Sequence, residues 1–292
     1  MTNYNKDGLV LLNKPIGMTS RQVLNHALKK IKVKTAGHTG TLDYYASGLL
    51  ILLCGNSRKL QQAFTKYDKK YKTVICLGKW SQTDDAEGPL FLVDNPTIPT
   101  KQEIHEAIDL FTGQIEQTPP AYSAIKINGK RAYKLAREGK KVELKSRKIN
   151  IYNIKLEKYE YPLLSLDIHC SSGTYIRSLA RDIGTKLECG GYLQSLQRTQ
   201  IKNFLLDKAL TLEELGEDSI IPLENVLEQY PKISLQKDCW QKIRNGIKVE
   251  IRHELDPEEF AFIWIEDRVV ALAKLAKNSV SSKKLLVHNL EK

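Results

Sequence analysis

The chain has 292 residues, of which 41% are hydrophobic, so it is long enough to form two compact domains of unequal size. Its 45 lysines and arginines outnumber its 34 acidic residues, and the formal net charge of +11 favours a polyanionic partner, nucleic acid before a membrane surface. No apolar run is long enough to span a membrane, and the N-terminal residues lack the apolar core of a signal peptide. We therefore expect a cytoplasmic protein.

The sequence contains no motif for a metal or a cofactor. Its five cysteines are scattered, without a Cys-x-x-Cys pair or histidines at matching spacing, so we expect reduced, buried thiols. Neither a Walker loop nor a dinucleotide fingerprint is present. A reaction that uses ATP, NAD or a metal ion is therefore not expected.

The N-terminal part alternates apolar strands with short helices. Residues 8–12 are typical of a buried strand, and Thr19 and Gln22 form a capping box before a helix whose apolar residues continue to Ile31. Residues 48–53 predict the next strand, residues 57–64 a helix, and residues 73–80 a further strand. Tyr71 would then lie at a strand entrance among lysines, a position that suits either packing or base stacking.

Between the first helix and the second strand lies a loop rich in glycine and hydroxyl groups. Gly37 and Gly40 let the backbone turn tightly and approach a ligand closely. Asp43 is the only acidic residue between Asp7 and Asp68, and its basic surroundings favour an ionised carboxylate. Taken alone, such a loop is more often a simple turn before a buried strand.

The middle of the chain carries a strongly basic insert. Residues 81–99 predict a loop, and a second capping box at Thr100 and Glu103 begins a helix. Between Lys126 and Lys148 ten lysines and arginines face two glutamates, within an insert at about residues 117–148. Because tyrosines and a Pro-Pro pair accompany the charges, we interpret the insert as a hairpin-like arm that grips a nucleic-acid backbone rather than as a solvated surface.

A second candidate position lies where a strand meets a helix. Residues 164–170 alternate as a strand, a break follows at residues 171–173, and apolar residues then recur at helical spacing from Ile176. Arg177 falls in the first helical turn, where the helix dipole disfavours a cation. This placement is explained if Arg177 pairs with an anion, and Asp43 is the obvious candidate.

The C-terminal part predicts a small separate β domain. Residues 192–199 predict a strand, and the stretch from about residue 215 to Pro231 is typical of a linker. Beyond it we expect a short helix at residues 239–244 and strands at residues 260–265, 269–273 and 285–288.

Several motifs occur in one order between about residues 8 and 200: Asn13-Lys-Pro-x-Gly-Met-Thr-Ser20, Gly37-His-Thr-Gly-Thr-Leu-Asp43, Ala46-Ser-Gly-Leu-Leu50, Lys70-Tyr71, Pro119-Pro-Ala-Tyr-Ser-Ala-x-Lys126 and Gly173-Thr-Tyr-Ile-Arg177. With them the chain resembles the bacterial TruB-type tRNA pseudouridine-55 synthases. It departs from the family at Tyr44-Tyr45, where Pro-Leu is usual, so the fixed φ of proline is lost beside Asp43.

The resemblance implies an α+β pseudouridine-synthase fold, with a mixed, largely antiparallel sheet flanked by helices. It places the catalytic domain at residues 1–230, with the basic RNA-binding insert inside it, and a PUA-like RNA-binding β domain at residues 231–292. The implied partner is tRNA, bound at its T-arm stem-loop by a monomer that needs no obligatory protein partner and no membrane.

The resemblance further implies isomerisation of the uridine at position 55 in the tRNA T-loop to pseudouridine. The uridine leaves its stack, its N1–C1′ bond breaks, and C5 bonds to C1′ without any cofactor. Asp43 would attack the sugar, with a glycal route possible, or add to the base, and the sequence leaves these open. Arg177 would hold Asp43 ionised and oriented.

Other residues take their expected roles from the same resemblance. Tyr71 would stack on the extruded base, a contact of roughly 1–3 kcal/mol, and Tyr175 would pack on its other side and assist proton removal from C5. Leu196 would close the apolar wall. The remaining expected contacts are His38 in the place of the flipped nucleotide, Lys14 supporting the Asp43 loop or a phosphate, and Tyr122, Lys126 and Arg131 in the insert binding RNA.

Two other interpretations remain open. A non-catalytic tRNA-binding or folding helper would use the basic arm alone, but the set Asp43, Tyr71, Tyr175 and Arg177 favours catalysis. A guide-RNA-dependent relative of the family is the other alternative. The basic insert favours a stand-alone enzyme, because it can hold RNA without partner proteins.

Overall fold

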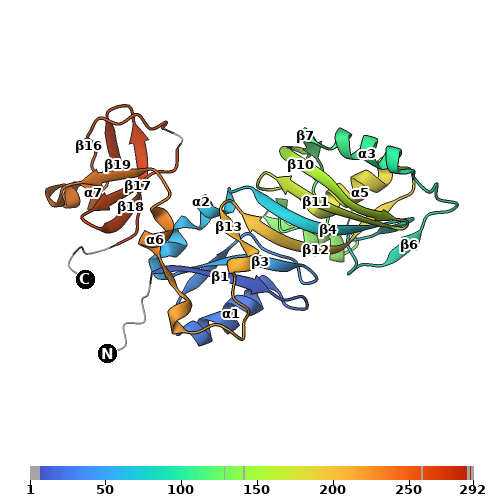
Figure 1. Ribbon diagram of the computed structural model, residues 1–292, viewed down its shortest axis with the longest axis horizontal. Coiled ribbons are helices and arrows are strands. Elements are labelled where there is room, and N and C mark those ends of the chain that lie inside the picture. Colours follow the sequence, from blue (N-terminus) through green and yellow to red (C-terminus); the bar gives the residue numbers. More distant parts are fainter. Residues whose placement is uncertain (1–6, 128, 141, 258, 288–289, 291–292) are drawn as a thin grey trace.

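A large mixed sheet forms the centre of the molecule. The computed structural model describes residues 7–127, 129–140, 142–257, 259–287 and 290. The strands of the large sheet are β1 (Gly8–Lys14), β2 (Ala36–Thr39), β3 (Ser47–Cys54), β4 (Lys69–Leu77), β7 (Gly113–Gln117), β10 (Arg147–Glu160), β11 (Leu163–Cys170), β12 (Gly191–Ile201), β13 (Phe204–Leu205) and β14 (Ile221–Pro222). Their order is β14-β1-β3-β12-β4-β11-β10-β7, with β2 beside β3 and β13 beside β12 (Figure 1).

The two halves of this sheet meet where β12 runs parallel to β3. The pairing is short, Gln197 to Ser47 and Arg198 to Gly48, whereas the other neighbouring strands along this order are antiparallel. Gly48 has a φ of +103°, and a Cβ at this position would clash with the backbone of Arg198. Glycine is therefore required here, because the two backbones are in direct contact.

Two of the helices begin where the capping boxes predict. The helices are α1 (Ser20–Ile31), α2 (Gln61–Thr65), α3 (Lys101–Leu110), α4 (Ala132–Arg137), α5 (Ile176–Lys186), α6 (Leu223–Leu227) and α7 (Trp240–Arg244), with 3₁₀ turns at Gly55–Leu60, Leu206–Lys208, Glu217–Ser219 and Lys237–Cys239. Thr19 and Thr100 each close the capping box that the sequence predicts. Helix α1 packs on β1 and β3 through Val23 and Leu24, and α3 and α5 pack on the half of the sheet that holds β4, β10 and β11.

The C-terminal sheet shares an apolar core with the large sheet. Its strands are β15 (Lys232–Leu235), β16 (Val249–Glu250), β17 (Phe262–Ile265), β18 (Arg268–Ala276) and β19 (Ser279–Leu285), in the order β15-β17-β18-β19-β16. Phe64 and Tyr67 from the α2 region lie in one buried cluster with Tyr230, Phe262 and Trp264. The small sheet, at the left of Figure 1, is thus joined to the rest by a continuous core rather than by a bare connection.

Three local predictions are wrong. The stretch before Pro231 is not a linker, because it forms β14 and α6, and Leu223 and Leu227 are buried in the shared cluster. The loop at residues 81–99 includes β6 (Leu90–Leu92), which pairs with β5 (Lys79–Ser81). The last strand is β19, which ends at Leu285 where the sequence predicted a strand to begin, and His288 lies outside the described residues.

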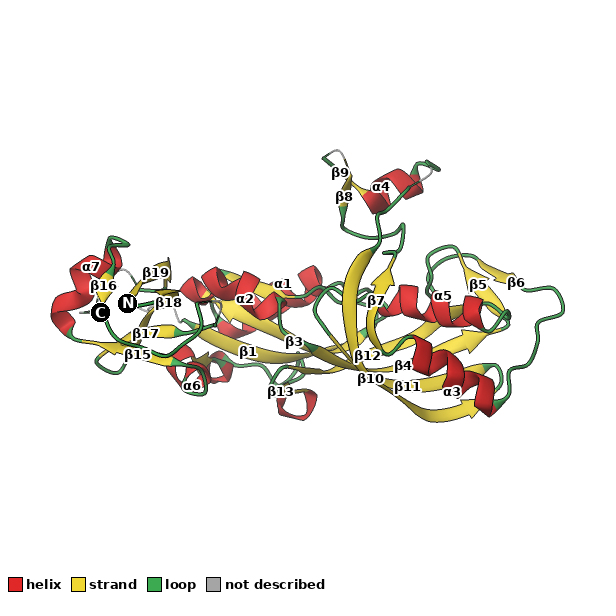
Figure 2. Cartoon of the chain, turned by 90° about the horizontal axis from the view of Figure 1, so that it is seen from above, coloured by secondary structure: helices red, strands yellow, loops and turns green. Residues whose placement is uncertain are grey.

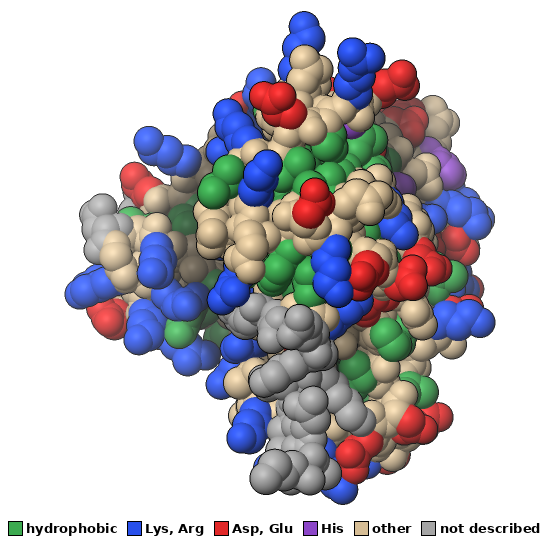
Figure 3. All heavy atoms as spheres, turned by 90° about the vertical axis from the view of Figure 1, so that its left-hand side faces the viewer, with side chains coloured by type: hydrophobic (Ala, Val, Ile, Leu, Met, Phe, Trp, Pro, Cys, Tyr) green, Lys and Arg blue, Asp and Glu red, His purple; other side chains and the backbone are tan. Residues whose placement is uncertain are grey.

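The basic insert projects from the body as an arm. Here β8 (Lys126–Ile127) pairs with β9 (Lys130–Arg131), and α4 follows directly. Figure 2 shows this arm standing away from both sheets, and in Figure 3 lysine and arginine side chains crowd the lobe that projects at the left. No helix in the described part of the chain is long and apolar enough to cross a membrane.

Candidate active site

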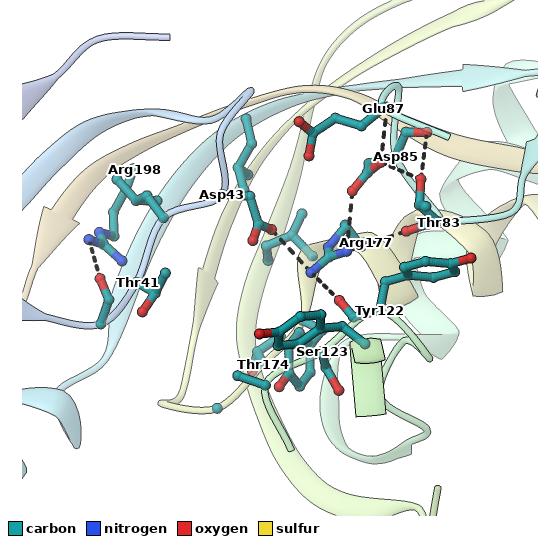
Figure 4. A pocket seen from close by; sticks show the side chains of 18 of the residues that line it. Thr41, Asp43, Thr83, Asp85, Glu87, Tyr122, Ser123, Thr174, Arg177 and Arg198 are labelled. Carbon is teal, nitrogen blue, oxygen red and sulfur yellow. Dashed lines mark hydrogen bonds and ion pairs between the residues drawn. The ribbon is translucent and has the colours of Figure 1, made fainter. Parts of the chain in front are cut away.

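The Arg177 side chain links two carboxylates from distant parts of the chain (Figure 4). Its Nη2 lies 3.2 Å from Asp43 Oδ2, and its Nη1 lies 3.2 Å from Asp85 Oδ2. The same nitrogens donate to the backbone carbonyls of Tyr122 and Thr83. These acceptors compensate for the unfavourable position of a cation in the first turn of α5. The contact with Asp43 is the pairing expected from the sequence.

The two carboxylates differ in how much of them remains accessible. The Asp85 side chain is 2% exposed, and it also accepts hydrogen bonds from the Thr83 hydroxyl and the Glu87 amide. The Asp43 side chain is 39% exposed and contacts Arg177 through one oxygen. Asp43 is therefore the carboxylate that a bound molecule can reach.

Two buried side chains, Ser20 and Lys14, hold the backbone of the loop that presents Asp43. The Ser20 hydroxyl donates to the Leu42 carbonyl and accepts from the Leu42 amide, both at 2.9 Å. Lys14 is fully buried, and its Nζ donates to the carbonyls of Ala46 at 2.6 Å and Pro15 at 2.8 Å. Burial lowers the pKa of Lys14 to about 8. Of the two roles expected for Lys14, these contacts favour support of the loop.

A cleft of about 1110 Å³ opens in front of the ion-paired carboxylate. Six of the predicted site residues line it, and they come from five different parts of the chain. They are Asp43 in the loop that precedes β3, Tyr71 on β4, Tyr122 in the insert, Tyr175 and Arg177 at the start of α5, and Leu196 on β12. The volume is at the upper end of ligand pockets, and the lining mixes aromatic rings with charged groups. It therefore suits a ligand that is both flat and polar.

Tyr71 is buried inside β4, not at a strand entrance as the sequence suggested. Its hydroxyl interacts with the guanidinium of Arg198 on β12. Arg198 is 1% exposed, and it donates to the carbonyls of Leu49 at 2.7 Å and Gly40 at 3.0 Å. Burial raises the pKa of Tyr71 although Arg198 opposes it, so the phenol presented to the cleft is neutral.

Tyr175 is held at the cleft wall by its backbone and its ring. It is the N-cap of α5, and the Gln117 side-chain amide bonds both its N–H, at 2.8 Å, and its carbonyl, at 3.0 Å. The Arg147 guanidinium lies 4.8 Å from the centre of the ring, a cation–π contact. The Gln117 contacts therefore hold the backbone of Tyr175, and the Arg147 contact lies over its ring.

The other predicted residues lie outside the cleft. His38 is on β2, its Nδ1 is buried without a hydrogen-bond partner among the described residues, and burial lowers its pKa. Lys126 and Arg131 face each other across the β8–β9 pair and are exposed. These three remain predictions for RNA contacts that do not involve the cleft itself.

Burial and charge act in opposite directions on Asp43. Burial raises the pKa of its carboxyl, and Asp85 adds to this, whereas Arg177 and Lys14 lower it. The net shift is upward, because burial is the largest cause. The expectation that basic surroundings determine the charge of Asp43 is therefore not met, because burial has the larger effect on its pKa. Within the described residues no group of three or more His, Cys, Asp or Glu side chains is arranged to hold a metal ion.

Comparison with known proteins identifies the family of this chain. Residues 28–176 match the family model described as "TruB family pseudouridylate synthase (N terminal domain)", and residues 177–237 match "tRNA pseudouridylate synthase B C-terminal domain". The chain belongs to the TruB family. The "tRNA pseudouridine synthase B" of Clostridium tetani is 37% identical over 96% of this chain and all of its own length. That of Aquifex aeolicus is 36% identical with the same coverage.

Solved structures confirm the fold of this TruB-family chain. The match to "Crystal Structure of a Cbf5-Nop10-Gar1 Complex" has a TM-score of 0.75 and covers 97% of this chain and 86% of that chain, at 22% identity. "Crystal structure of the archaeal box H/ACA sRNP Nop10-Cbf5 complex" matches with a TM-score of 0.74 and 21% identity, over 97% and 87% of the two chains. The predicted α+β class, with a mixed sheet and a C-terminal sheet, is confirmed.

The sequence interpretation missed three charged residues of the site. Asp85 lies in the segment at residues 81–99, which the sequence predicts only as a loop. Arg198 lies in a predicted strand where nothing distinguishes it from a surface arginine. Arg147 was considered only as part of the basic insert.

Proposed function

We propose that this TruB-family chain isomerises the uridine at position 55 in the T-loop of tRNA to pseudouridine. The relatives that match it over nearly their whole length are named tRNA pseudouridine synthase B. The observation that carries the proposal is the Asp43–Arg177 pair at a cleft lined by Tyr71, Tyr175 and Leu196. This arrangement provides a reachable carboxylate, a cation that orients it, and aromatic surfaces for a flat base.

In this proposal the base enters the cleft by leaving its stack. Tyr71 provides one face for stacking, and Tyr175 and Leu196 complete the enclosure. Asp43 then acts on the reacting nucleotide, through the sugar or through the base, while Arg177 keeps the carboxylate ionised and turned toward the cleft. Tyr175, held by Gln117 and Arg147, is positioned to assist removal of the C5 proton.

The rest of the molecule supplies RNA contacts in this proposal. The exposed cations of the arm, including Lys126 and Arg131, bind the backbone of the T-arm stem-loop, and Tyr122 connects the arm to the cleft. The C-terminal sheet from Lys232 onward serves as a PUA-like RNA-binding domain. The enzyme acts as a cytoplasmic monomer without cofactor.

The test follows the hydrogen that leaves C5. Full-length protein is incubated with T-arm stem-loop RNA that contains 5-tritiated uridine, and released tritium is counted. Wild type should release one equivalent per target uridine, whereas Asp43→Asn should release none and still bind the RNA. A wild-type protein that binds the RNA but releases no tritium would instead be a binding or folding helper. Dependence of release on an added guide RNA would favour a guide-dependent relative.

A further inference from the structure

Tyr45 lies two residues beyond Asp43, in the turn that leads into β3. Its ring packs against the buried cluster that includes Tyr71 and Ile176. Its hydroxyl oxygen is itself buried, and no described residue gives it a hydrogen-bond partner. Burying a hydroxyl without a partner costs free energy, so a residue of this kind needs an explanation beyond packing.

The charged groups around Tyr45 are those of the site. They come from three elements: Asp43 from its own loop, Arg177 from α5, and Asp85 and Glu87 from the segment between β5 and β6. Burial and the three carboxylates raise the pKa of the Tyr45 phenol well above its ordinary value. The hydroxyl therefore keeps its proton and can act only as a neutral donor or acceptor.

The Asp43 carboxylate lacks a second hydrogen-bond donor, and the Tyr45 hydroxyl is a donor without a partner among the described residues. Oδ2 of Asp43 contacts Arg177, but no donor among the described residues contacts its Oδ1. By comparison, both oxygens of Asp85 are occupied, by Arg177 on one side and by Thr83 and Glu87 on the other. A carboxylate held at one oxygen can still rotate, and a reacting group needs a defined orientation.

We propose that Tyr45 is a positioning residue for Asp43, and that its hydroxyl donates a hydrogen bond to the carboxylate in the substrate-bound enzyme. This inference rests on the proposed function. With Arg177 on one oxygen and the phenol on the other, the carboxylate has one orientation, and its ionised form is stabilised relative to the protonated form. The charged groups that also act on Asp43 are Arg177, Asp85 and Lys14.

The experiment compares Tyr45→Phe with Tyr44→Phe in the full-length protein. Both substitutions remove one phenol oxygen from adjacent positions of one loop, but Tyr44 is 48% exposed. The single-turnover rate on a T-arm transcript is measured against pH, together with RNA affinity by filter binding and the melting temperature. Tyr45→Phe should lower the rate by about tenfold at neutral pH and move the acid limb of the profile to higher pH. RNA affinity and melting temperature should not fall, and Tyr44→Phe should match wild type.

Two results would overturn the inference. One is a Tyr45→Phe enzyme whose rate and acid limb equal those of Tyr44→Phe. The other is a lower rate with an unmoved acid limb and a lower melting temperature, which would show that the ring position, not the hydrogen bond, had been disturbed. Failure of the proposed function is recognised by a different result, namely that the wild-type protein itself forms no pseudouridine. In that case the inference about Tyr45 fails as well.

Discussion

Asp43 and Asp85 lie on opposite sides of one guanidinium, each with an oxygen 3.2 Å from a nitrogen of Arg177. The trio holds two negative charges against one positive charge in a largely buried place. Such a cluster is tolerated only where further hydrogen bonds satisfy its members, as the Thr83 hydroxyl and the Glu87 amide do for Asp85. Asp85 thereby orients the cation, and the cation orients the reachable carboxylate.

Asp85→Asn tests this division of roles. The amide keeps the volume of the side chain but removes the charge that holds Arg177 Nη1, so the guanidinium should move toward Asp43. We expect turnover to fall at least tenfold while the affinity for tRNA stays within about twofold of wild type, because Asp85 is too buried to contact RNA. Single-turnover kinetics with a filter-binding control measure both. Unchanged turnover would show that Arg177 is positioned without Asp85.

The acid limb of the reaction should lie above the ordinary range of an aspartate. Burial raises the pKa of Asp43, and catalysis requires the ionised form, so the rate should fall as pH decreases through this raised value. Arg177 opposes the rise, so Arg177→Gln should move the limb to still higher pH in whatever activity remains. Tritium release measured across pH checks both statements. A limb at the ordinary value in wild type would contradict the burial argument.

Neutralising the arm should weaken RNA binding in a salt-dependent manner. In a Lys126→Gln/Arg131→Gln double variant, the slope of log affinity against log salt should become shallower by about 0.7–0.9 for each phosphate that the arm no longer neutralises. Turnover at saturating RNA should remain, because neither residue lines the cleft. A Lys155→Gln/Lys158→Gln variant on β10 is the matched control, since both lysines are exposed and pair with glutamates on the same strand. Equal slopes in the two variants would exclude the arm as an RNA-binding element.

Phe262→Ala tests the core shared by the two sheets. Phe262 is 1% exposed within the cluster that also contains Phe64 and Tyr230, so the substitution should lower the free energy of unfolding by roughly 3–5 kcal/mol. Calorimetry should show one transition that moves as a whole, because the cluster joins both sheets. Ile98→Ala is the control, since Ile98 is 63% exposed and should change stability by about 0.5 kcal/mol or less. Two separate transitions would mean that the C-terminal sheet melts independently.

Local signals predicted some elements of the fold well and missed others, among them the 14-residue strand β10. Both capping boxes begin helices at the expected residues, and the alternation of residues 164–170 marks β11 closely, because these signals act between neighbours in the chain. The sequence also suggested the pairing of Asp43 with Arg177, because the helix dipole disfavours a cation in a first helical turn that has no anion beside it. The prediction of a linker at residues 215–231 was wrong because this segment is held by distant contacts rather than by local signals. Short elements such as α6 are stabilised by packing from elsewhere, which the local pattern does not record.

The rest of the site depends on contacts between distant segments. Nothing local separates Asp85 from Asp84, yet one pairs with Arg177 and the other with Arg181, one turn later on α5. Arg198 likewise becomes a buried support only because β12 crosses beside β3. Both assignments require knowledge of which strands are neighbours, and that is decided by the packing of the whole domain.

The contact of Gly48 with the backbone of Arg198 has a mechanical consequence. With no side chain between the strands, the segment that carries Asp43 and the strand that carries Leu196 have no compressible layer to absorb relative movement. A shift of β12 at Arg198 would therefore act directly on β3 at Gly48, so we expect adjustment to an incoming strand to fall mainly to the parts that stand outside the sheet.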